Sequence, residues 1–562
     1  MLNSYCLIII PSISLPRFID IGLFRFFRLV KRQLISFYPP LRTEYSLFRI
    51  KFNELLPHDL FSSRTLIDSG DKVAIIVGYH APSLAVFQLP MTVALRKAGY
   101  TTYCLLPSFD IPASKYYLKA GVDRIISYED IYVDCSNIKP IFHEFCSSSD
   151  PITFSYNCIP IGKFIISSLM RSTRNGDVRS LLQNKALGFR YFKKSFIAAN
   201  RSLYIINRYS PSLICLFDKG YTPEGELTEL AISRDIKVST INTAHKSGHI
   251  IGKLYSKSNA NVHFSTPSDF FWHFLKKMPF SDNHLNRVLS EVRNSYNNNS
   301  WYDEVATQVN THFHSDLELI SKLNIDPNKP SVVLFPHLFW DATFFWGTDL
   351  FEDYVDWFTQ VVRTAANMNH INLIIKIHPS NITKNIRDGY TGQFSEILLL
   401  KKIFVDIPEH FTIIEPSTDI STLSVFSIMD FCLTVRGTVG IEAALFGKTV
   451  LTAGTGRYDG LGFTIDSHSK SEYLDKLVNI THLPRISQSQ IDLAQRYAYG
   501  LFIQRSIKLS SIDFRYTKDT SASLQIINNL DYSNIHAFKD IDLLSNWYKS
   551  LNSEDLVVYS NS

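Results

Sequence analysis

A glycine-rich junction, LTVRGTVGIEAALFG from residue 433, has the composition of an anion site. A strand pattern ends at Arg436, and a helix pattern follows Gly437, Thr438 and Gly440. The first backbone N–H groups of a helix attract anions, and glycine lets a ligand approach the backbone closely. We expect this junction to bind a phosphate, with Glu442 in reach of ribose hydroxyls. The alternative is that the glycines only allow strand and helix to pack closely.

A second polar position follows another apolar strand pattern, LIIKI, at His378. Pro379 biases the backbone of the residue before it toward an extended form. A histidine at the end of a strand can donate a hydrogen bond to a phosphate leaving group. A lone surface histidine is the plain alternative. Taken together with the glycine-rich junction, His378 favours a nucleotide site.

Aromatic side chains surround a third candidate segment, PHLFWDATFFW from residue 336. His337 and Asp341 lie among Phe and Trp residues there, a composition that suits stacking on a sugar or a base and equally suits a packed seam between domains. Arg457 lies in a further glycine-rich stretch, GTGRYDGLGF, which we interpret as a flexible loop at the ligand site.

The first half of the chain offers candidates for acid–base chemistry. Asp218 follows the apolar run SLICLF, and a carboxylate at such a strand end can act as a general base or a nucleophile. His80 follows the run AIIVG, and His245 follows the run VSTIN. Glu224 is a further candidate, although capping of the next helix explains it almost as well.

Alternating strand and helix patterns position these residues. The strand patterns are KVAIIVG, TTYCLLP, SLICLF and KVSTIN in the first half, and SVVLFP, LIIKI, FTIIEP, FCLTV and TVLTAG in the second. They predict an α/β fold with two doubly wound, Rossmann-like domains facing a cleft, and ligands at the carboxyl ends of the strands. The expected division is an N-terminal segment 1–60, an acceptor domain 61–315, a donor domain 316–535, and a C-terminal helix and tail 536–562.

Composition narrows the classes of function. A net charge of +5 over 562 residues is too small to indicate a nucleic-acid partner. The seven cysteines are scattered, without a CxxC pair, which disfavours a disulfide framework or a zinc site and fits a reducing cytoplasm.

The N-terminal region carries a basic amphipathic pattern. In residues 17–38, Arg25, Arg28 and Arg32 share one helical face, opposite an apolar face. Such a helix could lie in an anionic membrane surface, or it could pack on the first domain. The chain has no convincing signal peptide and no apolar stretch of membrane-spanning length. We therefore expect a cytoplasmic protein, with peripheral attachment to the inner face of the cytoplasmic membrane as an open alternative.

Three of these stretches together resemble known proteins. PHLFWDA, KIHP, and RGTVGIEAALFGK with TAGTGRY are similar to bacterial capsule and surface-polysaccharide biosynthesis proteins, best over residues 331–475. That family includes the Kdo transferases of capsule linkers and has the two-domain GT-B glycosyltransferase fold. The resemblance implies that His378 meets the nucleotide phosphate, as the HP pair of CMP-sugar-using bacterial sialyltransferases does. It also implies that the turn from Gly437 to Gly440 cradles the nucleotide, with Glu442 near its ribose.

The resemblance implies a glycosyltransferase. It would move a sugar, for instance Kdo from CMP-Kdo, from a nucleotide-sugar donor on the second domain to a glycan or glycolipid acceptor on the first. It carries over no catalytic base, so Asp218 depends on its position alone. GT-B enzymes commonly need no bound metal and the chain has no convincing DxD cluster, so we expect no metal and no cofactor. The alternatives are a polyol-phosphate polymer transferase or sugar epimerase on the same fold, and a non-catalytic glycan-binding or export-assembly protein.

Overall fold

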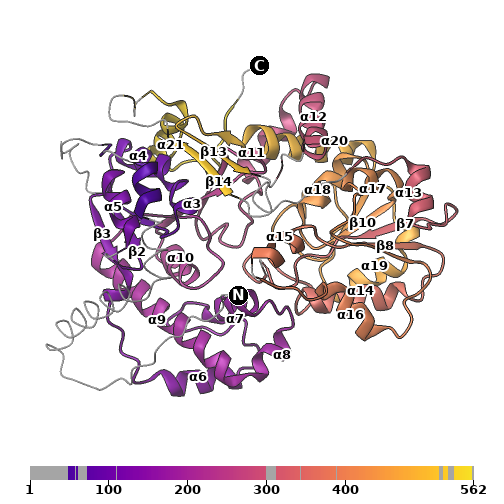
Figure 1. Ribbon diagram of the computed structural model, residues 1–562, viewed down its shortest axis with the longest axis horizontal. Coiled ribbons are helices and arrows are strands. Elements are labelled where there is room, and N and C mark those ends of the chain that lie inside the picture. The colour runs from indigo at the N-terminus through magenta and orange to yellow at the C-terminus, as the bar shows by residue number, and fades with distance from the viewer. Residues whose placement is uncertain are drawn as a thin grey trace.

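The computed structural model describes residues 49–56, 59–60, 72–108, 111–298, 301, 312–341, 343–387, 389–517, 523–528, 534 and 537–559. Figure 1 shows two lobes, one coloured indigo to magenta and the other orange. A separate β-sheet forms the centre of each lobe. The predicted α/β fold of two doubly wound domains is confirmed. The predicted basic helix at 17–38 lies outside the described residues.

The first sheet has the strand order β12-β6-β5-β4-β1-β2-β3. The strands from β5 to β3 pair in parallel, whereas β6 and β12 add in the antiparallel direction. In chain order the strands are β1 (Val73–Val77), β2 (Thr101–Leu106), β3 (Arg124–Ser127), β4 (Leu213–Leu216), β5 (Lys237–Thr243), β6 (His249–Tyr255) and β12 (Ile507–Lys508).

Helices cover both faces of this sheet. They are α3 (Pro82–Ala85), α4 (Gln88–Lys97), α5 (Pro112–Lys119), α6 (Ile138–Ser147), α7 (Ile161–Thr173), α8 (Val178–Gln183), α9 (Lys185–Tyr209) and α10 (Glu224–Ser233). Successive side chains of a strand point to opposite faces, so Ala74 and Ile76 pack with α4 and α5, and Ile75 and Val77 pack with α9 and α10.

The second sheet is wholly parallel, with the order β11-β10-β7-β8-β9. Its strands are β7 (Ser331–Leu334), β8 (Asn372–Lys376), β9 (Phe411–Ile414), β10 (Phe431–Thr434) and β11 (Thr449–Thr452). Its helices are α13 (Asp316–Lys322), α14 (Tyr354–Ala365), α15 (Ser380–Arg387), α16 (Ser395–Ile403), α17 (Thr422–Ile428), α18 (Thr438–Leu445), α19 (Lys470–Val478) and α20 (Gln488–Tyr499). Val332 and Leu334 pack toward α14 and α19, and Val333 packs toward α17 and α18.

The chain crosses between the domains more often than the predicted ranges allow. The helices α11 (Asp269–Lys277) and α12 (Asp282–Asn298) contribute Leu275 and Val292 to the core of the second domain, although their residues precede the predicted boundary at 315. After α20 the chain returns, and Ile507 of β12 joins the first sheet inside the range 316–535 that was expected to be the donor domain. Apolar side chains of these segments are buried against the domain on the other side of the predicted boundary.

The end of the chain also belongs to the first lobe. The helix α21 (Lys539–Ser550) packs against α4, where Ile541 and Leu544 enter the core of the first domain. Figure 1 shows this helix beside α4, with the hairpin of β13 (Ile512–Thr517) and β14 (Ser523–Asn528) next to it. Across the part of the chain that the structure describes, no helix has the length and apolar character to cross a bilayer.

Candidate functional site

The strand order of the second sheet predicts where a ligand binds. The chain runs from β7 to β8 and β9 on one side, and then places β10 and β11 on the other side of β7. Ligands of open α/β sheets bind beyond the carboxyl ends of the strands at this reversal. His337 follows β7, His378 follows β8, and Arg436 with Gly437 follows β10, so these sequence candidates meet at the ends of three adjacent strands.

His337 is held against the glycine-rich junction. Its ring stacks on Tyr354 with 4.7 Å between the ring centroids, and its Nε2 accepts a hydrogen bond from the backbone N–H of Arg436 at 3.3 Å. Burial and the Arg436 guanidinium lower the pKa of His337 to about 3. A neutral ring that accepts at Nε2 carries its proton on Nδ1. His337 therefore orients the junction as a neutral side chain.

His378 has the opposite tautomer. Its Nδ1 accepts from the backbone N–H of Ser380 at 3.2 Å, so the neutral ring carries its proton on Nε2. Burial and the Lys384 ammonium lower the pKa of His378 to about 4. The half-buried His378 can thus donate an N–H from Nε2 at physiological pH without carrying a positive charge. Donation of this N–H to a ligand stays a prediction, and Pro379 continues the chain into α15.

Arg457 brings a buried positive charge to the start of α18. Its guanidinium donates to Ser265 Oγ at 3.0 Å, to the backbone carbonyl of Arg436 at 2.9 Å and to Thr438 Oγ1 at 2.9 Å. Within the described residues no carboxylate lies at ion-pair distance from this guanidinium, although the side chain is only 9% exposed. These hydrogen bonds hold the loop in place, although the sequence predicts a flexible loop. The Arg457 guanidinium adds positive charge at the amino end of α18, where the helix dipole is also positive.

Arg436 has a different role from the one expected. Its guanidinium is 4% exposed and forms an ion pair with Asp349 at 2.5 Å. It also donates to the backbone carbonyl of Thr455 at 3.1 Å. These bonds connect the end of β10 to the loops that contain Asp349 and Thr455. The Arg436 side chain therefore stabilises the junction and does not point at a ligand.

Two further residues of the junction face away from the strand ends. A Cβ on Gly440 would lie 2.3 Å from the Tyr458 hydroxyl, so this glycine is needed for close packing of α18 on the loop. The carboxylate of Glu442, two residues further along α18, accepts a hydrogen bond from the Tyr296 hydroxyl of α12. Glu442 is buried against that helix and not directed to a ribose, because the helical period turns it onto the packed face.

The buried Glu442 leads to a prediction about stability. Burial raises the pKa of Glu442 from 4.5 to about 7, against the opposing hydrogen bond from Tyr296. Between these two values the folded protein holds a proton that the unfolded chain has released, so stability falls as the pH rises. We expect Glu442→Gln to be more stable relative to wild type at pH 8 than at pH 5, by up to about 3 kcal/mol. Thermal unfolding of both proteins across that range measures it, and an unchanged difference would contradict it.

In the first sheet the strand order reverses between β1 and β4, because β2 and β3 lie on one side of β1 and β4 lies on the other. Asp218 follows β4 and has a side chain that is 39% exposed, 3.8 Å from Arg171. Desolvation raises the pKa of Asp218, although the backbone N–H of Gly220 donates to its Oδ1 at 3.0 Å.

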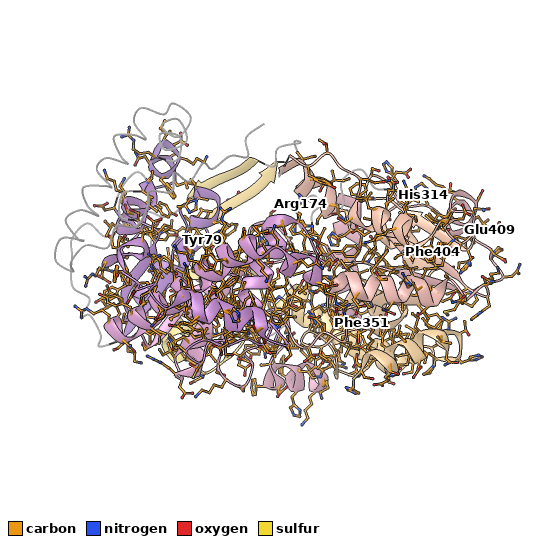
Figure 2. All side chains as sticks on the ribbon, turned by 90° about the horizontal axis from the view of Figure 1, so that it is seen from below. Tyr79, Arg174, His314, Phe351, Phe404 and Glu409 are labelled. Atoms are coloured by element: carbon orange, nitrogen blue, oxygen red, sulfur yellow. The ribbon has the colours of Figure 1, made fainter. Side chains whose placement is uncertain are left out.

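His80 follows β1 and is exposed. Beside it, Tyr79 lies close enough to Glu224 and Asp218 for their charges to raise its pKa, after burial as the main cause. Figure 2 shows Tyr79 in the first lobe.

Glu224 is a stronger candidate in the structure than in the sequence. It is half-buried at the first position of α10, and no side-chain cap is formed there. Burial, followed by the charges of Asp218 and Glu226, raises the pKa of Glu224 to about 8. Asp218 and Glu224 therefore form a pair of neighbouring carboxyl groups, each with a raised pKa.

Asp341 joins the two domains at this edge. Tyr221 of the first domain donates to Asp341 Oδ1 at 2.9 Å, and Lys384 of α15 forms an ion pair with Oδ2. Although burial opposes ionisation, Lys384 and then Arg171 lower the pKa of Asp341 to about 2. The charge of Asp341 also acts on His378 and on Asp218, so the reversal points of the two sheets face each other.

His245 lies outside this site. Its Nε2 is 3.1 Å from Glu291 of α12, and its ring packs on Trp301 and Phe502. It is 5% exposed, and burial lowers its pKa. The prediction that His245 belongs to the cleft is wrong, because α12 covers the end of β5.

Sequence reasoning missed Arg171, Tyr221 and Lys384. They lie in α7, in the β4–α10 loop and in α15, where no local pattern distinguishes them from ordinary surface residues. Lys376, in contrast, interrupts the apolar run LIIKI, which was a readable signal. It is 6% exposed and donates to the backbone carbonyl of Ile420 at 3.3 Å, and burial lowers its pKa to about 8.

A metal-binding cluster is not evident in the described ranges, where no group of three or more His, Cys, Asp or Glu side chains is arranged to hold an ion. Among curated proteins no match is found.

Solved structures with similar folds are remote. A Kdo transferase from Thermosulfurimonas dismutans, KpsC (beta Kdo 2,4 transferase), is 13% identical, with 51% of this chain and 79% of that chain covered and a TM-score of 0.31. A UDP-GlcNAc 2-epimerase from Neisseria meningitidis is 11% identical over 77% and 97%, with a TM-score of 0.25. A glycosyltransferase from Rickettsia africae is 11% identical over 86% and 100%, with a TM-score of 0.27.

The family comparison is more direct. The model of the family described as capsule polysaccharide biosynthesis protein matches residues 290–492, from α12 to α20. This range contains the three motifs on which the resemblance was based, and the two facing α/β domains have the GT-B-like arrangement that it implied. Residues 290–492 of the chain thus resemble the capsule polysaccharide biosynthesis proteins, as the motifs predict.

Proposed function

We propose that this protein is a glycosyltransferase of capsule or surface-polysaccharide synthesis. The second domain would hold a nucleotide-sugar donor, with its phosphate between the Nε2–H of His378 and the start of α18. The first domain would hold a glycan or glycolipid acceptor, with Asp218 as the base or nucleophile. Kdo carried by CMP is the first donor to test, because the motifs resemble those of capsule Kdo transferases.

One observation carries this proposal. Arg457 is a buried guanidinium that lacks an acidic partner at ion-pair distance within the described residues, and it lies at the positive end of α18, where its charge acts on the neutral His337. A buried charge is costly unless it is compensated. A phosphate at the reversal point of the second sheet would supply the missing negative charge.

The carboxyl groups of the first domain supply the second half of the chemistry. Asp218 and Glu224 lie at the facing reversal point, and the pKa of each is raised, chiefly by desolvation. A carboxyl group whose pKa is raised toward the working pH is suited to acid–base work. The Asp341 bridge through Tyr221 and Lys384 holds this pair near the proposed phosphate position.

A nucleotide screen followed by a turnover assay tests the proposal. We expect one of CMP, CDP, UDP or GDP to raise the melting temperature, since a ligand at 100 times its dissociation constant adds about 2.7 kcal/mol. The sugar form of that nucleotide should then be hydrolysed or transferred. Binding without turnover would favour a non-catalytic glycan-binding role, conversion of the donor to its epimer would favour an epimerase, and absence of any nucleotide binding would reject the proposal.

A further inference from the structure

Arg174 lies at an unusual position between the two domains. It ends α7 in the left-handed conformation, with φ 55° and ψ 32°. Glycine is the usual residue at such a helix end, because a side chain makes this conformation unfavourable. The nearby Gly176 has no room for a Cβ, which would lie 2.5 Å from the backbone oxygen of Phe339 in the second domain. The corner between α7 and α8 is therefore pressed onto the second domain.

The Arg174 guanidinium contacts several groups of the second domain. It lies over the ring of Trp340 at 4.9 Å and over the ring of Tyr390 at 5.2 Å. It donates to the backbone carbonyl of Lys384 at 2.9 Å and to Asn385 Oδ1. Figure 2 shows Arg174 at the border between the lobes. A planar guanidinium suits this combination of stacking and paired donors better than an ammonium does.

Arg174 contacts the helix α15. This helix begins directly after the His378–Pro379 pair, and His378 is proposed to donate a hydrogen bond to the phosphate. α15 runs from Ser380 to Arg387, and the N–H of Ser380 fixes the ring of His378. Further along the same helix, Lys384 binds both Asp341 and the Trp340 ring. One short helix therefore connects the Arg174 contact at its carboxyl end to the orientation of His378 at its amino end.

We propose that Arg174 is a positioning residue that couples the docking of the first domain to the orientation of His378 through α15. This inference extends the proposed function, but the position of α15 can be measured without any substrate. Loss of the guanidinium should free α15 from the first domain and leave each domain core intact.

Hydrogen–deuterium exchange, followed by mass spectrometry of peptides that cover 379–387, tests the coupling in the full chain. Arg174→Gly suits this test, because glycine accepts the left-handed backbone and removes only the side chain. We expect exchange in α15 to become at least about tenfold faster, which corresponds to about 1.4 kcal/mol, while the strands of both sheets stay protected. Arg174→Lys should restore part of the protection.

Arg179→Gln is the matched control. Arg179 forms an ion pair with Glu352 across the same domain boundary, but within the described residues it makes no hydrogen bond or ion pair with α15, and its side chain is 77% exposed. This variant should leave exchange in 379–387 unchanged. Unchanged exchange in Arg174→Gly, or equally fast exchange in both variants, would overturn the coupling whatever the protein binds.

Nucleotide binding provides the second measurement. If a nucleotide is found by the screen, Arg174→Gly should weaken it several-fold, Arg174→Lys should weaken it less, and Arg179→Gln should bind as wild type does. Faster exchange in α15 with unchanged nucleotide affinity would show that the contact only holds the domains together and would reject the positioning role. Absence of nucleotide binding in the wild type would reject the proposed function and leave the exchange result standing.

Discussion

Asp218→Asn should reduce donor turnover by at least about 100-fold while leaving the affinity for the donor near that of wild type. The amide has the shape of the carboxylate and can still accept the hydrogen bond from Gly220, so the backbone after β4 keeps its form. What it loses is the ability to accept a proton or to attack a sugar. The raised pKa of Asp218, due chiefly to desolvation, makes this carboxylate a better base than one with an ordinary pKa.

A matched aspartate separates this effect from a general loss of charge. Asp235 lies on the same domain and pairs with Lys257 through a side chain that is 77% exposed. Asp235→Asn should turn over donor at the wild-type rate, measured side by side with Asp218→Asn under saturating donor. Near-normal turnover in Asp218→Asn would transfer the role to Glu224, whose half-buried carboxyl group lies next to Asp218.

His378→Ala should weaken nucleotide binding about 10- to 150-fold, because a hydrogen bond to a charged group is worth about 1.5–3 kcal/mol. Gly437→Val should weaken it by a different route. A Cβ at Gly437 would point toward Thr434 Oγ1 at 2.9 Å and His337 Cε1 at 3.7 Å, so a branched side chain would fill the junction where the phosphate is expected. Since both changes act on one bound group, the double variant should lose less than the sum of the single losses.

Calorimetric titration of the nucleotide into the wild type, both single variants and the double variant measures this coupling. His410→Ala is a suitable control. His410 lies at the amino end of β9, away from the carboxyl ends of the strands, and it contacts the backbone carbonyl of Ala365 at 3.0 Å. Its affinity should equal that of wild type. Full additivity would indicate two separate sites, and unchanged affinity in a folded His378→Ala protein would end the interpretation of the HP pair as a nucleotide contact.

The sequence by itself determined the scaffold and the position of the site along it. Runs such as LIIKI and FCLTV are short and apolar and stop at a polar residue, and parallel strands place such residues at one edge of the sheet. His337, His378, Gly437 and Asp218 were identified for that reason. This information is local, because the strand period and the turn residues are contained in a few consecutive positions.

The directions of the side chains were decided by the tertiary structure. The sequence predicts Glu442 and His245 as site residues, but α12, which lies far from both in sequence, covers them and supplies Tyr296 and Glu291 as partners. The sequence predicts Arg436 as a ligand contact, but its guanidinium forms an ion pair with Asp349 inside the second domain. A pattern in one segment cannot contain the charge or the surface that another segment brings against it.

The same reason explains what was missed. Arg174 contacts Lys384 and Tyr221 contacts Asp341 only because the first domain docks on α15 and on the loop after β7. The return of α21 and β12 to the first lobe likewise follows from apolar surface that α4 and β6 leave to be covered. Burial of such surface is a property of two faces together, so the sequence fixes each face and only the folded chain pairs them.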